Sequence, residues 1–549
     1  MRSANLRRRV LVLALCVCCA LLPQMSLQES VSAASATKNN LITQVRVGLC
    51  VPELSTGVYV SSAVSNDGFM VGAYRESDRS FVPSFGLSSS ALAILPDRNS
   101  DLTFREDGTV TGKASGSGNY GAYNLTDGKI YSGYSAALTA AGKKSDGFVA
   151  CVDGGYQARF GRYSSYESAS AAAGKTYRVA SPVEGGIVLV DGKSGKTVLE
   201  YECTSPLALR GKNNGEVSLN TVSARHGYLG FFVFYATSKM KVINVLDMET
   251  YTKCVMSNEI GTNATVETRR AFSVLVRTVA LHAYKHDKYG ADVCYTTCCQ
   301  VYLGTYRRSS ENDAIVDSTK GQYVAYEGEP ISCLYHNSNG GASCSSVAAW
   351  GGSEIPYLTS VTLKEDAGNI SEMWQYTFTQ KELYDFLSSR VAFSGLEGSI
   401  HDVRIDGTDP YGSGYVTLLS VTDRYGNEVS VKTSEKVRTA LKFQSANFTV
   451  SYSAQAEVVG ADGTVSTRKV GGYVDANGKY VEFDSFEKYT LAGTDETFGA
   501  DTIRFDGVGV GHGVGFSSNG SEQLAEHGYS YRYIIQFYFS GTEILNLYS

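Results

Sequence analysis

The stretch MKVINVLDMETYTKCVMSNEIGTNATVETRRAFSVLVRTVALHAY, residues 240–284, decides the fold of this chain. It opens with an apolar run from Met240 to Leu246, and a second apolar run from Gly227 to Phe234 precedes it. Two such runs around a polar break predict a β-hairpin. The hairpin therefore lies directly before the part of the stretch that carries helical periodicity.

That second part predicts the longest helix of the chain. From Ala264 to Tyr284, apolar residues recur at the spacing of one helix face, which is typical of an amphipathic helix. Asn263 or Thr265 can cap its start, and Glu267 suits its first turn. The recurring apolar positions are Phe272, Leu275, Val276, Val279 and Ala283.

The composition around this stretch favours strands. The chain has 549 residues and 43% hydrophobic content, enough to bury a large core in two or three domains. Its 37 tyrosines favour strands and flat aromatic surfaces. The net charge of -6 provides no basic field for nucleic acid, so we exclude that partner. We predict an α+β fold, strand-rich with a central amphipathic helix.

The N-terminal residues 1–36 have the order of a secretory signal. Arginines at positions 2 and 7–9 precede an apolar run from Val10 to Leu22, and small residues dominate from Val31 to Ala36. The apolar run is shorter than the roughly 20 residues that span a bilayer. A cleaved signal is favoured over a permanent anchor, and either one predicts an extracytoplasmic chain, secreted or membrane-anchored at the N-terminus.

A strand-rich segment, residues 37–115, is followed by a candidate insert at residues 116–205. Within the insert, Phe148–Tyr156 predicts a strand, and Tyr166–Ala173 predicts a short helix that Gly174 could end. This order resembles the sporulation-related (SPOR-like) repeat, and the resemblance implies binding to glycan strands stripped of peptides. An ordinary α+β insert fits the same residues equally well.

Four separated motifs then follow one another along the chain. They are Ser257–Ile260 with Arg277–Ala280, Cys299–Tyr302, Tyr335–Gly341 with Trp350–Gly352, and Gly509–Ser517. In this order they resemble the stage II sporulation protein D (SpoIID/LytB) family. The resemblance implies a catalytic domain over residues 218–549.

The resemblance also implies an activity: a lytic transglycosylase that cleaves peptide-stripped peptidoglycan strands during endospore engulfment. Glu259 stands at the family's glutamate position, and we expect it just before the helix, where a loop could expose it to a groove. One carboxylic acid suffices, because the sugar's own hydroxyl replaces water, whereas an ordinary glycosidase uses two carboxylates. The alternative is a non-catalytic cell-wall-binding protein or amidase enhancer, and a structural adhesin is a third possibility. Expected partners are glycan strands, an amidase and other engulfment proteins.

Five further residues are candidates for binding the glycan. Arg277 matches the arginine of a family signature, and Arg270 lies seven residues before it, on the same helix face. Each could orient a sugar or form a structural ion pair. Tyr335, His336 and His512 fall in the last two motifs, where they could bind sugar hydroxyls or serve as buried structural groups.

Three cysteines form a C-x3-C-C cluster: Cys294, Cys298 and Cys299. Some family members bind zinc here, so the resemblance implies a structural zinc site that His286 or His336 could complete. In an exported protein, disulfides are the rival. Their candidate partners are Cys254, Cys333 and Cys344.

The chain departs from the family beside the predicted acid. Ile260-Gly261 stands where the family has Met-Pro, Val279 replaces a tyrosine, and Phe516-Ser517-Ser518 replaces Met-Ser-Gln. These changes bear on catalysis more than on the fold.

Overall fold

The computed structural model describes residues 41–220, 225–283, 285–363, 372–459, 461–490 and 492–548. The predicted signal, residues 1–36, lies outside the described residues. The chain forms two compact units. Among the described residues, the N-terminal unit comprises 41–263, 272–323 and 546–548, and the C-terminal unit comprises 264–271 and 324–545. The predicted domain at 218–549 is thus distributed over both units.

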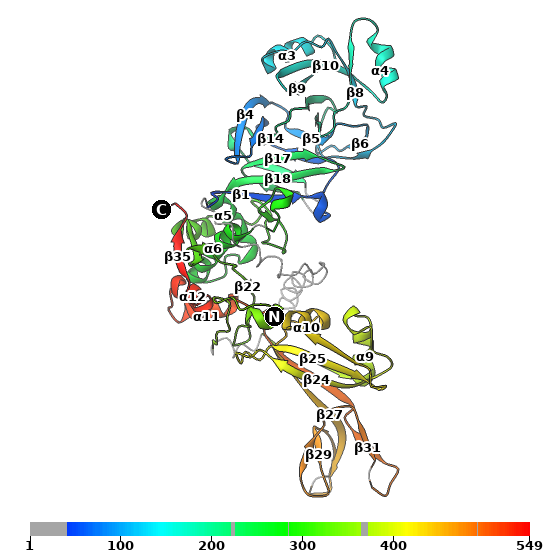
Figure 1. The fold of residues 1–549 in the computed structure, drawn as a ribbon, viewed down its shortest axis with the longest axis vertical. Coiled ribbons are helices and arrows are strands. Elements are labelled where there is room, and N and C mark those ends of the chain that lie inside the picture. The colour runs from blue at the N-terminus through cyan, green and yellow to red at the C-terminus, as the bar shows by residue number, and fades with distance from the viewer. Residues whose placement is uncertain are drawn as a thin grey trace. The chain divides into compact units, whose positions relative to one another are not determined.

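A seven-stranded sheet forms the base of the N-terminal unit (Figure 1). Its centre is the predicted hairpin, which is confirmed as the antiparallel pair β17 and β18. In sheet order the strands are β19 (Val293–Cys294), β1 (Gln44–Cys50), β18 (Met240–Asp247), β17 (Phe231–Ala236), β14 (Leu207–Gly211), β3 (Phe69–Arg75) and β4 (Ser80–Leu87).

The second large sheet of this unit has ten strands. A small hairpin of β6 (Ser100–Phe104) and β7 (Val110–Ala114) accompanies it. In sheet order its strands are β11 (Arg178–Ala180), β8 (Tyr123–Thr126), β10 (Gly155–Tyr163), β9 (Phe148–Val152), β13 (Thr197–Tyr201), β12 (Ile187–Asp191), β5 (Ala91–Pro96), β2 (Ser61–Val64), β15 (Val217–Asn220) and β16 (Arg225–Tyr228).

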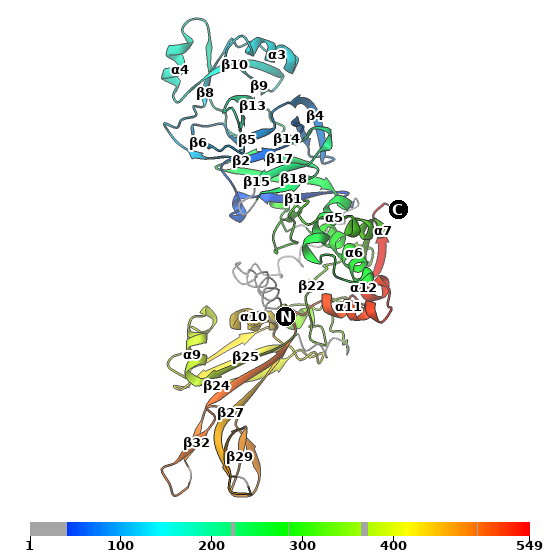
Figure 2. The same ribbon diagram turned by 180° about the vertical axis from the view of Figure 1, so that it is seen from behind.

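The insert forms one end of this ten-stranded sheet. It runs β8, α3 (Tyr134–Ala141), β9, β10, α4 (Tyr166–Ala173) and β11, which is the order of a split β-α-β unit. Figure 2 shows both helices beside these strands. The predicted helix at 166–173 is confirmed: Ser165 caps its start, and Gly174, with φ 56°, follows its last residue. The strands of the insert are continuous with the rest of the sheet, because β9 pairs with β13.

Three helices complete the N-terminal unit: α5 (Met248–Glu259), α6 (Val266–His282) and α7 (Ser310–Ser318). α5 begins where β18 ends, because the Asp247 side chain accepts a hydrogen bond from the Thr250 N–H at 2.9 Å. The predicted long helix is confirmed as α6, whose first residues belong to the C-terminal unit. Thr265 caps it by accepting from the Thr268 N–H.

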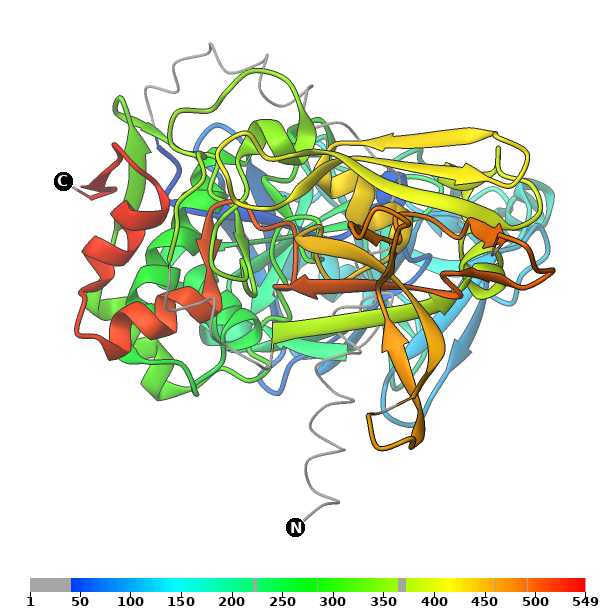
Figure 3. The same cartoon turned by 90° about the horizontal axis from the view of Figure 1, so that it is seen from below.

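The C-terminal unit has two main sheets. Figure 3 shows their strands in yellow and orange. One sheet has the order β23 (Met373–Thr379), β33 (Thr502–Val508), β27 (Phe448–Val459) and β28 (Val465–Val470). The other has the order β24 (Ile400–Thr408), β25 (Val416–Asp423) and β26 (Glu428–Lys432).

The remaining elements, which lie mainly in the C-terminal unit, are smaller. The helices are α8 (Ser346–Trp350), α9 (Gln380–Ser388), α10 (Ser434–Leu441), α11 (Ser518–Glu526) and α12 (Tyr531–Tyr538). The short strands are β20 (Gln322–Tyr326), β21 (Glu329–Pro330), β22 (Tyr335–His336), β29 (Gly472–Val474), β30 (Tyr480–Glu482), β31 (Lys488–Thr490), β32 (Thr497–Gly499), β34 (Phe516–Ser517) and β35 (Glu543–Asn546).

Helices and numerous strands occur together in the described chain, which confirms the α+β, strand-rich prediction. Within the described residues, every helix is too short or too polar to cross a membrane.

Candidate functional site

Glu259 is the last residue of α5 and is partly exposed. Its Oε1 atom accepts a hydrogen bond from the Val301 N–H at 2.5 Å. The prediction that Glu259 lies in a loop is wrong, because the helix that Asp247 caps continues to this residue. Gly261 then ends the helix: it has φ 70°, and its N–H donates to the Met256 carbonyl at 3.2 Å. A glycine stop therefore stands where the family has proline.

The second motif, Cys299–Tyr302, packs against α5 and positions Glu259. Tyr251 on α5 donates its hydroxyl to the Gln300 Oε1 atom at 3.0 Å, and its ring stacks on Tyr302. Tyr302 in turn donates to Asn244 on β18 at 2.6 Å. These buried contacts fix the backbone that presents the Val301 N–H to Glu259.

The cysteine cluster lies immediately before this motif. The ligand atoms of His286, Cys294, Cys298 and Cys299 all lie within 4.8 Å of one another. Three thiols and one imidazole form the donor set that tetrahedral zinc prefers, so the residues fit the predicted metal. The structure supplies His286 as the fourth donor. Cys254, Cys333 and Cys344, the predicted disulfide partners, are buried free thiols.

Electrostatics at the cluster favours a thiolate. Hydrogen bonds with Cys294 and Cys299 lower the pKa of Cys298, although burial opposes them. Lys285 also donates its Nζ to the Cys298 sulphur at 3.1 Å. The thiolate is the form of cysteine that binds metals, so this direction is consistent with the predicted zinc site.

The opposite end of α5 holds a second carboxylate, Glu249, in a buried ion pair with Arg277. The two meet at 2.6 Å between Nη2 and Oε2, and at 3.0 Å between Nε and Oε1. Arg277 is 0% exposed and also donates to the Val316 carbonyl and the Thr319 hydroxyl. Of the two roles predicted for Arg277, the structure therefore shows the structural ion pair.

The other predicted arginine, Arg270, also forms an ion pair. Its Nη1 lies 2.6 Å from the Glu267 Oε1 atom, three residues earlier on α6, and its side chain is about a third exposed. A sugar-binding role for Arg270 or Arg277 remains a prediction.

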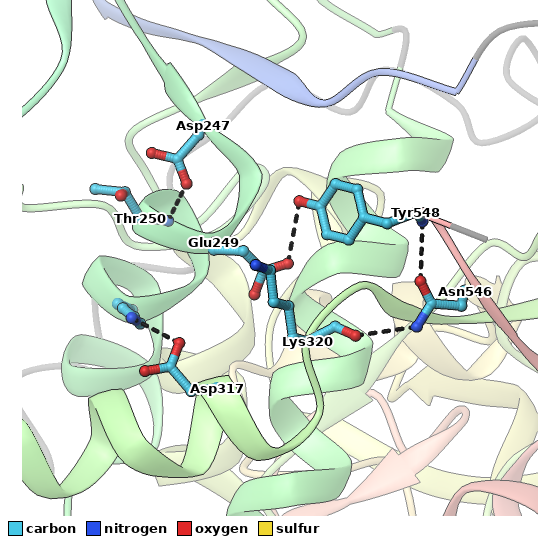
Figure 4. A pocket seen from close by; sticks show the side chains of 8 residues that line it. Asp247, Glu249, Thr250, Asp317, Lys320, Asn546 and Tyr548 are labelled. Atoms are coloured by element: carbon cyan, nitrogen blue, oxygen red, sulfur yellow. Dashed lines mark hydrogen bonds and ion pairs between the residues drawn. The ribbon is translucent and has the colours of Figure 1, made fainter.

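A cavity of about 660 Å³ lies at the Glu249 end of α5 (Figure 4). Three of its charged groups already form ion pairs: Lys253 meets Asp317 at 2.7 Å, and Glu249 is paired with Arg277. The Tyr548 hydroxyl also donates to Glu249 at 3.3 Å. Glu259 is not among its lining residues. Glu259 thus lies apart from this cavity, at a point where two of the quoted motifs meet. The lining residues are Asp247, Glu249, Thr250, Lys253, Asp317, Lys320, Asn546 and Tyr548.

Tyr335, His336 and His512 come together within the C-terminal unit, because β22 and β34 pair in parallel. His512 Nδ1 accepts from the Val514 N–H at 3.0 Å, so its Nε2 carries the hydrogen and donates to the Tyr335 carbonyl at 3.1 Å. His336 Nδ1 donates to the Val514 carbonyl at 3.2 Å. The two imidazole rings are 5.4 Å apart between centroids.

Burial lowers the pKa of both histidines, and for His336 the neighbouring His512 lowers it further. Both rings are therefore neutral at pH 7. Within the described residues, His336 Nε2 is buried without a hydrogen-bond partner. As the unprotonated nitrogen of a neutral ring, it is an acceptor.

Comparisons with known proteins agree with these motifs. The family model described as SpoIID, stage II sporulation protein, matches residues 236–326. An amidase enhancer of Bacillus subtilis is 27% identical over 308 residues, 53% of this chain and 40% of the relative. Residues 236–326 of this chain are therefore similar to the SpoIID family. An uncharacterised protein of Brachyspira hyodysenteriae is 26% identical over 326 residues, 58% of this chain and 72% of the relative.

The SpoIID match covers α5, α6 and the cysteine cluster, and it ends before the Tyr335 motif. This chain spans less than half the length of the Bacillus subtilis relative. Two site residues escaped sequence reasoning. Glu249 lay inside the stretch 240–284 without a predicted role, and Lys285 had no signal beyond its place beside His286.

Proposed function

We propose that this chain has a cell-wall role in sporulation, and that it cleaves peptide-stripped glycan strands as a lytic transglycosylase. The match of residues 236–326 to the SpoIID family supports the first part. The observation that carries the second is Glu259, which stands at the family's glutamate position and is held by the Val301 N–H. We further propose that the chain works outside the cytoplasm, secreted or anchored at its N-terminus.

In this proposal, Glu259 acts first as an acid and then as a base. Its proton passes to the glycosidic oxygen as the bond to the anomeric carbon breaks. The sugar's own C6 hydroxyl then attacks that carbon, and its proton returns to the Glu259 carboxylate. The products are a new sugar end and an anhydro-sugar end, and no water is consumed.

Of the two paired histidines in the C-terminal unit, His336 is our candidate to contact a sugar. Its Nε2 is buried in this structure, so the proposal requires the surrounding side chains to admit the hydroxyl. Its neutral ring presents Nε2 as an acceptor, which suits a hydroxyl donor. We propose that His336 orients a glycan hydroxyl, while His512 holds the local backbone through Tyr335.

We propose a structural zinc ion held by His286, Cys294, Cys298 and Cys299. When bound, zinc would cross-link the segment that leads into Val301. The chain's own part is to keep the Val301 N–H aimed at Glu259, so loss of the metal should act through the position of the acid.

A non-catalytic role is the second candidate. The Bacillus subtilis relative is named an amidase enhancer, and Ile260-Gly261 departs from the family beside the acid. In that role, the chain would bind glycan and assist an amidase without cutting.

Digestion of peptide-free glycan strands by the purified protein separates the two candidates. The lytic proposal predicts anhydro-ended fragments, identified by mass spectrometry. Glycan that sediments with the protein yet stays intact would contradict it and favour the wall-binding role. A gain in amidase rate on intact peptidoglycan, without anhydro ends, would identify an enhancer.

A further inference from the structure

Two cysteines outside every family motif lie side by side in the insert. Cys151 lies within β9, and Cys203 lies two residues after the end of β13. Their sulphur atoms are 3.2 Å apart. Neither residue belongs to the metal cluster, so the pair requires its own explanation.

The strand register places these sulphurs together. β13 pairs in parallel with β9, with Tyr201 opposite Cys151. The ladder continues one step further, because the Glu202 N–H donates to the Cys151 carbonyl at 2.9 Å. Residues two apart on a strand share a face, so Cys203 projects on the same side as Tyr201 and next to Cys151.

Further contacts hold the segment that carries Cys203. The Thr204 N–H donates to Asp153 at 3.1 Å, in the turn between β9 and β10. Glu202 forms an ion pair with Arg159 on β10. The two thiols are therefore held close by the surrounding backbone, and this does not depend on any bond between them.

The pair also differs from the other thiols outside the metal cluster in its access to solvent. Cys151 and Cys203 are both partly exposed, whereas Cys50, Cys254, Cys333 and Cys344 are buried. A hydrogen bond from Cys151 lowers the pKa of Cys203. Cys203 is therefore the better nucleophile of the two.

We propose that Cys151 and Cys203 are a disulfide-forming pair that joins the insert to the segment leaving β13. A disulfide needs sulphurs about 2.0 Å apart, so small side-chain rotations suffice. This modification site is independent of the proposed function.

The oxidant is a small-molecule or protein disulfide. The Cys203 thiolate attacks one of its sulphurs, which forms a mixed disulfide and expels one thiolate. The Cys151 thiolate then attacks the Cys203 sulphur, which closes the protein disulfide and expels the second thiolate. Two protein thiols are oxidised, one external disulfide is reduced to two thiols, and the two protons go to solvent.

The bond would close a ring that contains β10, α4, β11, β12 and β13. It would also tie β9 of the insert to the connection between β13, in the ten-stranded sheet, and β14, in the seven-stranded sheet. A cross-link of this span reduces the number of conformations open to the unfolded chain, and so it stabilises the folded insert. The nine cysteines of the described chain then divide into a metal cluster of three, this pair and four buried thiols.

Peptide mapping of the full chain tests the proposal. Reduced protein is incubated with glutathione disulfide, denatured with a chelator and an alkylating reagent, and digested with trypsin. We expect the peptides Ser145–Arg159 and Thr197–Arg210 to appear joined, and to separate when a reductant is added before alkylation. Both peptides alkylated singly, or Cys203 joined to any other cysteine, would overturn the proposal.

Variants test the order of attack and the structural effect. Cys151→Ser should trap glutathione on Cys203, whereas the control Cys254→Ser should still close the bond. In the oxidised wild type, a reductant should lower the thermal midpoint by about 5–10 °C. No such fall is expected in the double variant Cys151→Ser/Cys203→Ser. An equal fall in both proteins would contradict a stabilising cross-link.

Discussion

The two ends of α5 hold their carboxylates in different ways. Glu249, near the start, is 9% exposed and forms a bidentate ion pair with the fully buried Arg277. Glu259, at the end, is partly exposed, and its Oε1 atom accepts from the Val301 N–H of a neighbouring motif. A buried carboxylate in a bidentate ion pair stabilises the fold. A carboxylate that is oriented by a hydrogen bond and still accessible to solvent is suited to exchange a proton. From this difference we propose a structural role for Glu249 and a chemical role for Glu259.

Glu249→Gln should give the largest loss of stability. The substitution leaves the Arg277 guanidinium buried without its counter-charge, which costs about 3–5 kcal/mol. Denaturant unfolding of the purified variant measures this. Glu526→Gln is the matched control, because Glu526 is an exposed glutamate at the end of α11. A Glu249→Gln protein as stable as this control would remove the structural assignment.

Lys285→Ala tests the metal cluster beside Glu259. Lys285 donates to the Cys298 sulphur, and loss of such an outer contact weakens metal binding by about 10–100-fold. Competition with a zinc-binding dye gives the affinity. Lys288→Ala is the control, since Lys288 lies over Tyr289. Equal zinc affinity in both variants, or no zinc binding in the wild type, would contradict the proposed site.

Acid should destabilise the folded protein through the His336 and His512 pair. Burial lowers the pKa of both rings in the folded state, so the unfolded chain binds more protons below about pH 6.5. Their contribution is complete above that pH and is lost as the pH falls below it, by up to about 1.4 kcal/mol per pH unit for each ring.

The thermal midpoint measured from pH 7.5 to 5 should therefore fall towards acid, and less steeply in His336→Gln than in the wild type. Parallel pH profiles in the two proteins would show that His336 does not titrate in this way.

Arg270→Ala should have the smallest effect. Its pair with Glu267 is about a third exposed, so solvent screens it, and we expect a loss of about 0.5 kcal/mol or less. Chemical denaturation of Arg270→Ala and Glu249→Gln in parallel compares their free energies of unfolding directly. A loss of several kcal/mol would mean that Arg270 supports the fold as Glu249 does.

The sequence predicted the elements that local periodicity determines. The β17–β18 hairpin, α4 and α6 follow from apolar spacing, a serine or threonine cap and a glycine stop, all within a few residues. Each of these signals acts over short separations, so the residues that carry it are adjacent in sequence.

Long-range contacts were beyond that reasoning. Residues 248–259 had an N-cap and a glycine stop, yet the family motif within them suggested a loop at Glu259. The partner of Arg277 is 28 residues away, and the choice of His286 over His336 depends on how α6 returns to β19. The pairing of β9 with β13, which makes the insert part of a larger sheet, likewise has no local signal.

The central claim is that Glu259 carries the chemistry. The direct measurement is the rate at which wild type, Glu259→Gln and the control Glu526→Gln release anhydro-ended fragments from peptide-free glycan, with thermal midpoints recorded for each. We predict a loss of about 10²–10⁴-fold in Glu259→Gln alone, at an unchanged midpoint. Wild-type rates in a folded Glu259→Gln protein would contradict the claim.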